Sequence, residues 1–290
     1  IAYNSDKRVS IQDVDVFLKE ASMVTRKIDV DHLIYLWDAV FLAGKQINRD
    51  AIGMFTEKAG IVHPSVIMVN EEMIFLGRGS RINAGVVLDA SEGPIIISDH
   101  VKIDIGALIK GPAVIGAKSV INPAARLRGN VILGPVCKVG GELEDVVIQG
   151  YSNKQHDGFL GHSYLGEWVN LGAGTNNSDL KNNYGKIRFD FGDDQVDSGL
   201  TFLGAMIGDY VKTGIATMLN TGTYIGTGAN VFGGGFQRKH IPAFSWGEND
   251  RAQLSKFLKT CEIMKVRRGM ILSETEKELL TACYGRMKPL

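Results

Sequence analysis

The sequence predicts an all-β solenoid, a parallel β-helix of six-residue repeats flanked by helices at both ends of the chain. Between Ile97 and Glu144 the chain divides into consecutive hexads that each open with Ile, Leu or Val: ISDHVK, IDIGAL, IKGPAV, IGAKSV, INPAAR, LRGNVI, LGPVCK and VGGELE. A helix repeats its apolar residues at i, i+3, i+4 and i+7, and an ordinary strand at every second residue, so a strict period of six fits neither. The 35 glycines also suit a chain that turns every few residues. We therefore expect each hexad to form one flat face with its opener buried, and equivalent positions to recur about every 18 residues.

Composition limits the kinds of partner. Lys plus Arg equal Asp plus Glu at 32 each, so no excess of positive charge favours nucleic acid or an anionic membrane. The three cysteines are too scattered for a disulfide framework or a CxxC metal site. No apolar run reaches the roughly 18 residues that span a bilayer, and no signal peptide is recognisable. We expect a cytoplasmic protein that binds neither membrane nor nucleic acid.

Residues 1–60 are predicted to be a helical adaptor. A short amphipathic helix is expected from Ser10, its N-cap, and a second helix over Asp31–Phe55, interrupted near Gly44. The LAGK segment at Leu42–Lys45 is not a nucleotide-binding loop, because no strand precedes it and the surrounding glycines are missing. The same residues are open to a second interpretation, as the remnant of a truncated nucleotidyltransferase-like domain.

Residues 61–240 are predicted to form the β-helix. A strand is expected at Ser65–Asn70, and the first hexads are separated from the long block by a three-residue slip at Pro94–Ile96. The polar stretch Asn176–Gly199 is predicted to be an excursion loop. Hexads on its two sides open at Leu165 and Ile207, which are 42 residues or seven hexads apart, so both should lie on the same face.

Residues 241–290 are predicted to form a helical cap. We expect the chain to leave the coils at Gln237, followed by a helix over Arg251–Arg268 and a last helix opened by a capping box of Ser273 and Glu276. Such helices would cover the unpaired strand edges of the last coil.

Several motifs are more specific than the repeat. They are ARLRG at Ala125–Gly129, His156, VNLGAGT at Val169–Thr175, and above all the run GYSNKQHDGFLGHSYLGEWVNLGAGTNNSDLKNNYG. With them the chain resembles the bacterial sugar nucleotidyltransferase and glucosamine-1-phosphate N-acetyltransferase family, the hexapeptide-repeat acetyltransferase half of the bifunctional enzyme that forms UDP-N-acetylglucosamine.

That resemblance implies left-handed coils, a homotrimer with the acyl site between neighbouring solenoids, and a role in nucleotide-sugar biosynthesis. It further implies acetyl-CoA as co-substrate and a sugar phosphate as acceptor, with Mg²⁺ required only if an upstream nucleotidyltransferase domain exists. The alternative is a non-catalytic trimerising or regulatory stem of a sugar-1-phosphate nucleotidyltransferase.

The resemblance also suggests which residues act on the acceptor. Counted back from GAGT, His156 occupies the position of the general base, whereas His162 does not, and a His accepts protons at neutral pH. Arg128 matches a phosphate-binding arginine, and Lys154 is a nearby cation. Phe159 replaces a substrate-binding tyrosine and Asp179 an asparagine. Glu144 stands where the family has a phosphate-binding lysine, which puts glucosamine-1-phosphate itself in doubt.

The acetyl donor has its own candidate residues. Backbone N–H groups around Gly172, Ala173 and Gly214 are candidates for the thioester oxygen. Arg238 and Lys239, directly after the last coil, are candidates for the CoA phosphates. A zinc site made of His100, His156 and His162 is a competing interpretation. We expect no metal, since one hexad turns the chain by about 120° and separates the last two histidines onto different faces.

Overall fold

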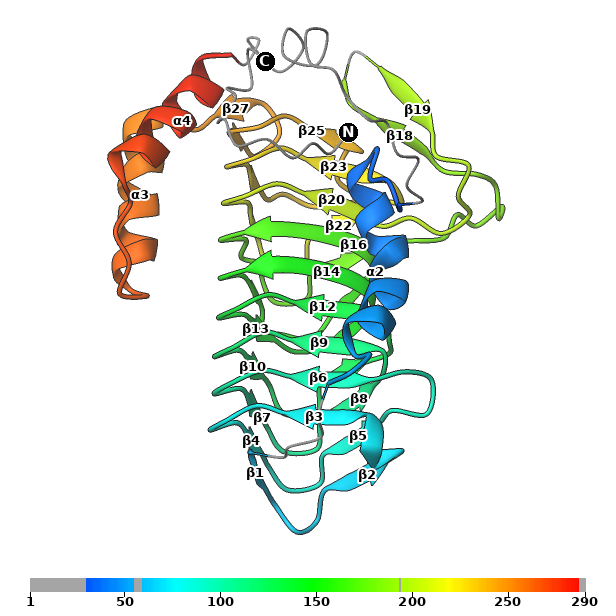
Figure 1. Ribbon diagram of the computed structural model, residues 1–290. Helices are drawn as coiled ribbons and strands as arrows, with labels where there is room; N and C mark the ends of the chain where they lie inside the picture. The colour runs from blue at the N-terminus through cyan, green and yellow to red at the C-terminus, as the bar shows by residue number, and fades with distance from the viewer. Residues whose placement is uncertain (1–29, 55–58, 193, 287–290) are drawn as a thin grey trace, which may run out of the picture. The chain divides into compact units, whose positions relative to one another are not determined.

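Parallel strands stacked in three ladders form the body of the protein (Figure 1). The computed structural model describes residues 30–54, 59–192 and 194–286, and this architecture belongs to the unit Ile34–Leu290. In Figure 1 the chain climbs from β1, strands on the front face point to the left, and each is followed by strands at the left edge and then at the back. This is a left-handed winding, the exception to the usual right-handed crossover. The predicted fold class, a left-handed parallel β-helix with flanking helices, is confirmed.

Each ladder joins one face of successive coils. The first ladder contains β1 (Ile61–Val62), β4 (Arg81–Ile82), β7 (Lys102–Ile103), β10 (Val120–Ile121), β13 (Lys138–Val139) and β15 (Asn153–Lys154), and then β21 (Lys212–Thr213), β24 (Asn230–Val231) and β26 (Ser245–Trp246). The second contains β2 (Ile67–Val69), β5 (Val87–Asp89), β8 (Leu108–Lys110) and β11 (Arg126–Leu127), with β17 (Asn176–Asn177) and β22 (Met218–Leu219) higher up. The third contains β3 (Ile74–Leu76), β6 (Ile95–Ile97), β9 (Ala113–Ile115), β12 (Val131–Leu133), β20 (Ala205–Ile207), β23 (Thr223–Ile225) and β25 (His240–Ile241).

Two longer strands, β14 (Glu142–Gly150) and β16 (Phe159–Glu167), cross from the second ladder to the third. The first residues of β14 pair with β11, whereas its later residues pair with β12. These two strands therefore run through a corner of the coil instead of ending at it.

The register of the ladders confirms the repeat read from the sequence. Ile95 pairs with Ala113, and Ala113 with Val131, 18 residues on in each case. Ile74 pairs with Ile95, so the three-residue slip lengthens one coil to 21 residues. Leu165 pairs with Ile207, as seven intervening hexads predict.

The core of the β-helix consists of the hexad openers. They are buried from first to last in the long block: Ile97, Ile103, Ile109, Ile115, Ile121, Leu127, Leu133 and Val139. Glycine is required after some of them, because a Cβ at Gly134 would lie 1.7 Å from the carbonyl oxygen of Gln149 in the next coil. The inward aliphatic column thus fixes the register, and the glycines allow the coils to approach each other.

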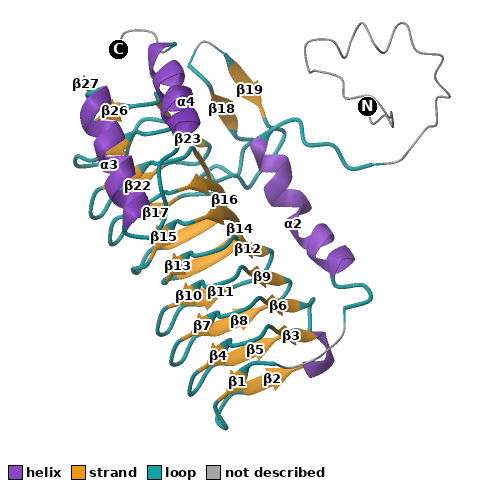
Figure 2. Ribbon diagram, turned by 60° about the vertical axis from the view of Figure 1, so that its left-hand side comes forward, coloured by secondary structure: helices purple, strands orange, loops and turns teal. Residues whose placement is uncertain are grey.

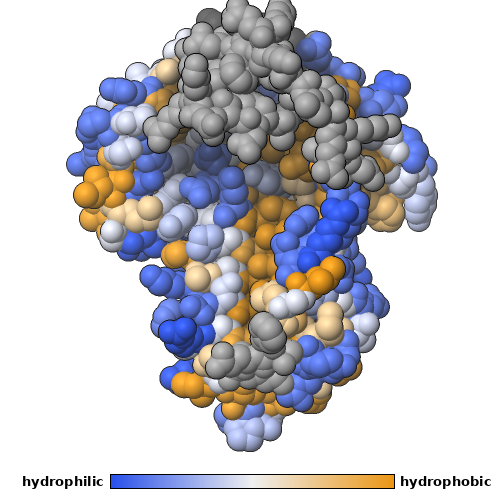
Figure 3. Space-filling model, viewed as in Figure 1, coloured by the Kyte–Doolittle hydropathy of each residue, from blue (hydrophilic) through white to orange (hydrophobic). Residues whose placement is uncertain are grey.

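A helix and a hairpin cover part of the third ladder. Helix α2 (Leu36–Asp50) lies along β14 and β16, and Figure 3 shows apolar side chains gathered over the strands beside it. The excursion forms an antiparallel hairpin of β18 (Arg188–Asp190) and β19 (Gln195–Asp197). Its Phe189 is buried against Trp37 of α2, with ring centroids 5.1 Å apart. The excursion is therefore packed onto the helix, where the sequence predicted only a loop.

The C-terminal helices lie beside the upper coils (Figure 2). Helix α3 (Leu254–Val266) runs along the first ladder, and α4 (Glu274–Gly285) packs on it. Just beyond α3, Arg268 donates to the carbonyl oxygen of Val136 at 3.2 Å, several coils below the last one. These helices therefore flank the coils, whereas the sequence placed them across the end.

Other local expectations have mixed outcomes. The Ser273 hydroxyl caps α4 by accepting from the N–H of Glu276, as predicted. The helix α2 continues through Gly44, whose missing Cβ would lie 2.1 Å from Oδ1 of Asn130, so that glycine serves close packing and not a break. The coils continue past Gln237, since β25 and β26 extend two ladders and β27 (Asp250–Arg251) pairs back onto β26.

Two further features complete the description. A short 3₁₀ helix, η1 (Glu71–Met73), connects β2 and β3. The helix expected from Ser10 lies outside the described residues. Within the described ranges, no helix combines the length and the apolar content needed to cross a bilayer.

Candidate functional site

Charged side chains gather where β14 and β16 turn the corner between the second and third ladders. We call this group the corner cluster: Arg126, Arg128, Glu142, Glu144, Asp145, His162 and Asp179. Asp145 and His162 occupy the corner itself, with φ angles of 52° and 45° in the left-handed region. Because Glu144 pairs with Gly161 and Val146 with Ser163, these two residues lie directly above one another in successive coils.

His162 is held between two carboxylates. Its Nδ1 lies 2.8 Å from Oδ2 of Asp179, and its Nε2 lies 3.6 Å from Oδ2 of Asp145. The ring stacks on Phe202 at 5.2 Å and lies 5.9 Å from Phe41 of α2. An imidazole whose Nδ1–H donates to Asp179 keeps the lone pair of Nε2 available to accept a proton. The arrangement is that of a histidine base oriented by a carboxylate.

The surroundings raise the pKa of His162 above its ordinary value. Burial alone lowers this pKa, but the hydrogen bond with Asp179 and the charges of Asp145, Asp179 and Glu144 outweigh burial. Each of these carboxylates stabilises the imidazolium form. His162 is therefore a stronger base than a free histidine.

The two arginines of the corner cluster are paired with glutamates. Arg128 contacts Glu142 at 2.9 Å and Glu144 at 3.1 Å, while Arg126 contacts Glu142 at 3.2 Å. Both arginine side chains remain about half exposed, at 50% and 52%. They can therefore reach a ligand, although a phosphate would have to compete with the glutamates.

Neighbouring residues hold the cluster in place. Asn130 donates to Asp145 at 2.9 Å, and α2 packs on Asn130 through Gly44. A Cβ at Gly161 would lie 2.5 Å from Oδ2 of Asp179 and 2.4 Å from Cζ of Phe159. The absence of a side chain at Gly161 thus lets Asp179 and Phe159 approach His162.

The residues predicted from the sequence are only partly brought together. Arg128, Phe159 and Asp179 meet at the corner cluster. His156 is exposed one turn away, and its imidazole has no hydrogen bond or ion pair within the part of the chain that the structure describes. Lys154 is 2% exposed and donates to the carbonyl oxygens of Gly140 and His156. Burial lowers the pKa of Lys154 to about 8.

The backbone groups considered for the thioester oxygen are engaged inside the coils. The N–H of Gly172 donates to Thr213 Oγ1 at 2.9 Å, and the N–H of Gly214 to the carbonyl of Val231 at 2.7 Å. The carbonyl of Ala173 accepts from Ala216. These hydrogen bonds leave neither glycine N–H free to bind an oxyanion in this conformation.

The two basic residues after the last hexads lie near the top of the β-helix. Arg238 is exposed, donates to the carbonyl of Glu248 and lines a small cavity of about 150 Å³. The pKa of Lys239 is lowered, first by burial and then by Lys181. Within the described ranges, no three His, Cys, Asp or Glu side chains are arranged to hold a metal ion.

The residue that sequence reasoning missed is His162. It was set aside because counting back from GAGT favoured His156. The signal that identifies it is a coil of 17 residues: Glu142 pairs with Phe159 at this spacing, and Asp179 follows His162 by the same number. A strict 18-residue repeat hides that relation.

The comparisons with known proteins agree with the predicted resemblance. No protein-family model matches the sequence. Over 152 residues the chain is 33% identical to a bifunctional sugar-1-phosphate nucleotidylyltransferase/acetyltransferase of Sulfurisphaera tokodaii, covering 52% of this chain and 38% of the relative. Over 169 residues it is 29% identical to the bifunctional protein GlmU of a Cyanothece species, covering 58% of this chain and 32% of the relative. The chain thus spans about a third of the length of these curated relatives.

Among solved structures, the UDP-N-acetylglucosamine acyltransferase of Francisella novicida aligns with a TM-score of 0.34 and 14% identity, covering 79% of this chain and 78% of that one. A match at this level concerns the fold alone. The resemblance to the hexapeptide-repeat acetyltransferase half of the bifunctional enzymes is confirmed by the curated relatives.

Proposed function

We propose that this chain is an acyltransferase that moves an acetyl group from acetyl-CoA to the amine of an amino-sugar phosphate. The observation that carries the proposal is the pairing of His162 Nδ1 with Asp179 at 2.8 Å inside the corner cluster. The relative from Sulfurisphaera tokodaii supports it, since its name combines acetyltransferase with sugar-1-phosphate nucleotidylyltransferase. The chain then carries the acetyltransferase activity of such an enzyme, and Mg²⁺ is required only if an upstream nucleotidyltransferase domain exists.

In the proposed reaction the sugar amine attacks the thioester carbonyl carbon, and the C–S bond breaks. His162 Nε2 takes the proton that the amine loses and passes it to the departing CoA thiolate. Asp179 keeps the imidazole in the required tautomer and stabilises the imidazolium. Such a base contributes about 10²–10⁴ in rate.

The charge of the corner cluster favours an amine-bearing acceptor. Two arginines face four carboxylates, namely Glu142, Glu144, Asp145 and Asp179. This excess of negative charge attracts an ammonium group and repels a phosphate. Arg128 is the side chain of the cluster that could still bind a phosphate. We therefore expect the amine to lie near Asp145 and His162, and the phosphate, if present, to displace a glutamate from Arg128.

The donor site belongs to the same proposal. Arg238 and Lys239 bind the CoA phosphates, and coil residues near Gly172, Ala173 and Gly214 line the pantetheine path. Lys154, because it is buried, supports the loop that carries His156. Three chains assemble so that donor and acceptor sites face each other between neighbouring solenoids.

Two histidine variants test which base acts. His162→Ala should lower kcat by about 10²–10⁴ in an assay that follows free thiol release from acetyl-CoA with a panel of amino sugars and their 1-phosphates. His156→Ala is the matched control on the exposed loop, and it should retain most of the activity. If His156→Ala loses activity and His162→Ala retains it, the general base is His156, the residue that the sequence suggested.

A non-catalytic stem is the alternative function. The engagement of Arg128 by two glutamates favours it, because a paired arginine binds phosphate less readily. Absence of both thiol release and CoA binding by the wild-type chain, with all acceptors tried, would support the stem and refute the transferase.

A further inference from the structure

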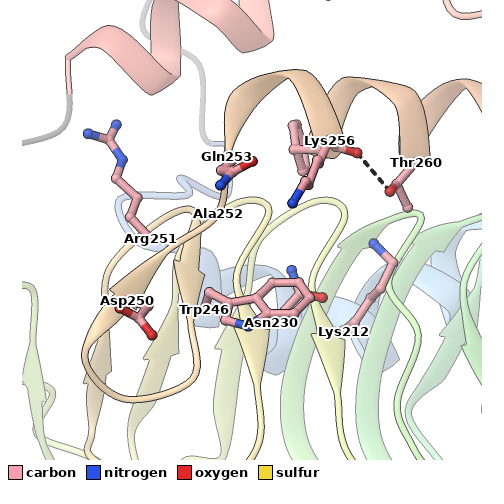
Figure 4. Close-up of a pocket in the computed structure, with 10 residues that line it drawn as sticks. Lys212, Asn230, Trp246, Asp250, Arg251, Ala252, Gln253, Lys256 and Thr260 are labelled. Atoms are coloured by element: carbon pink, nitrogen blue, oxygen red, sulfur yellow. Dashed lines mark hydrogen bonds between the residues drawn. The ribbon is translucent and has the colours of Figure 1, made fainter.

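Cavities between α3 and the first ladder form a groove. In Figure 1, α3 lies on another side of the β-helix from α2, the helix that packs at the corner cluster. The groove consists of two cavities, of about 730 Å³ and about 460 Å³, and Lys212 of β21 lines both. Figure 4 shows the larger cavity, in which the side chain of Lys212 rises from the strands and that of Lys256 descends from α3. Two ammonium groups thus enter the same space from opposite walls.

The walls of the groove are strongly basic. The smaller cavity adds Lys138, Arg267 and Arg268 to Lys212, and its described lining residues include no Asp or Glu. The described lining of the larger cavity includes one carboxylate, Asp250, whose carboxyl group points away from the two lysines in Figure 4. Although the chain has no net charge, several of its cationic side chains therefore lie together in one groove.

Within the described residues, Lys212, Lys256, Arg267 and Arg268 form no ion pair with an acidic side chain. Lys212 Nζ donates to the carbonyl of Tyr210 at 3.3 Å, and burial lowers its pKa. By contrast, Lys265 of α3 is paired with Glu276 at 2.7 Å. Arg251 also lines the larger cavity, but its guanidinium lies over the ring of Tyr284 at 3.7 Å. Lys212 is half-buried, and a partly desolvated cation is stabilised by a nearby anion, so an anionic ligand would stabilise Lys212.

An aromatic surface lies beside the cations. The indole of Trp246 forms the floor of the larger cavity in Figure 4 and is 50% exposed. The ring of Phe232 lies nearly perpendicular to the indole, at a centroid distance of 5.6 Å. Asn230, on the neighbouring strand, adds an amide that can donate or accept hydrogen bonds. Flat aromatic faces of this kind stack on nucleobases.

We propose that this groove is a second ligand site, which binds a nucleotide with two or more phosphates. The base stacks on Trp246, and the phosphates lie between Lys212 and Lys256 and extend toward Arg267 and Arg268. The size of the larger cavity is within the range of small-ligand sites. The proposal is independent of acyl transfer at the corner cluster, because it concerns different residues.

Isothermal titration calorimetry of the full chain with UTP, ATP, CoA and inorganic tripolyphosphate tests the site. We expect at least one nucleoside triphosphate to bind with a Kd below about 1 mM, and more tightly than tripolyphosphate. Lys256→Ala and Lys212→Met should each weaken that binding by about tenfold. Lys259→Ala is the matched control, since this lysine lies on the exposed side of α3 and pairs with Glu262 at 3.7 Å.

Trp246→Ala separates base recognition from charge. This variant should bind the nucleotides more weakly than the wild type does, and it should bind tripolyphosphate with unchanged affinity. CoA carries the same adenosine and phosphate chemistry, so its competition with UTP identifies which of the two ligands the groove prefers. A preference for UTP supports a second ligand site, whereas a preference for CoA would make the groove the donor site and overturn its independence from acyl transfer. The proposal is overturned if no nucleotide binds, if tripolyphosphate binds as tightly as the nucleotides, or if the Lys256 and Lys259 variants behave alike. Circular dichroism of each variant verifies that it is folded.

Discussion

His162 is the residue on which the proposed chemistry depends, and its carboxylate partner should control the pH at which it works. A base must be neutral to accept a proton, and the raised pKa of His162 means that activity should increase with pH through a value above 6.5. In Asp179→Asn the carboxylate that stabilises the imidazolium is lost, so the pKa of His162 falls. The acidic limb of the kcat/KM profile should then move to lower pH, and kcat should fall because the tautomer is no longer fixed.

The control for this profile is Asp197→Asn on the excursion hairpin, where the carboxylate accepts a hydrogen bond from the N–H of Gly199 at 3.0 Å. Its profile should coincide with that of the wild type. An unchanged acidic limb in Asp179→Asn would mean that His162 does not set the pH dependence.

Lys154 predicts a pH dependence of stability. Its pKa is about 8 in the folded protein and 10.5 in the reference state, so between these values the unfolded chain binds more protons. The free energy of unfolding should therefore rise as pH increases from about 8 to about 10.5, and the contribution is lost as pH falls through 8. When urea unfolding is measured across this pH range, the free energy of unfolding should rise more steeply with pH for the wild type than for Lys154→Met. Equal slopes for the two proteins would mean that burial does not lower the pKa of Lys154.

Individual site residues were predictable only where the sequence keeps its repeat. Arg128 lies inside the regular hexads, and its position beside the corner follows from their period. His162 and Asp179 lie in coils of altered length, where the residue spacing between neighbours has to be measured. Glu142 and Glu144 could be seen as acids, but their pairing with Arg128 depends on strand crossing through the corner.

At the scale of elements, the coils are specified by aliphatic openers and by glycines that admit the next coil. Gly134→Ala should cost about 1–3 kcal/mol or more, because its Cβ would lie 1.7 Å from a backbone oxygen that cannot rotate away. Gly234→Ala is the matched control, since no atom lies within 4 Å of its Cβ and its φ is not in the left-handed region. The measurement is the free energy of unfolding in urea. Similar values for the two variants would contradict the close-packing role.

Elements outside the repeat were less predictable. The two C-terminal helices were expected, and Ser273 caps the second of them. Their position beside the coils depends on contacts between distant residues, such as Arg268 with Asn153 at 3.0 Å. Phe189 packs on Trp37 for the same reason: an apolar residue in a polar stretch has no periodicity that would identify its partner.

At the scale of the molecule, the second ladder offers an apolar surface suited to self-association. Its outward side chains include Ile67, Val69, Leu108 and Met218, with exposed fractions of 58%, 43%, 47% and 37%. Ile215, at the neighbouring corner, is 82% exposed. Exposed apolar residues that gather on one face of a protein commonly mark an interface. The proposed trimer would cover them.

Sedimentation equilibrium should therefore report about three times the chain mass of 31.6 kDa. Ile215→Asp places an unpaired charge in the interface, which costs several kcal/mol if buried, so this variant should sediment as a monomer. Ile271→Asp is the matched control, because Ile271 is 84% exposed between α3 and α4, away from the second ladder. It should remain a trimer. If acyl transfer takes place between neighbouring solenoids, the Ile215 variant should also lose activity while retaining its folded spectrum. A wild-type monomer with full activity would show instead that each solenoid carries a complete site.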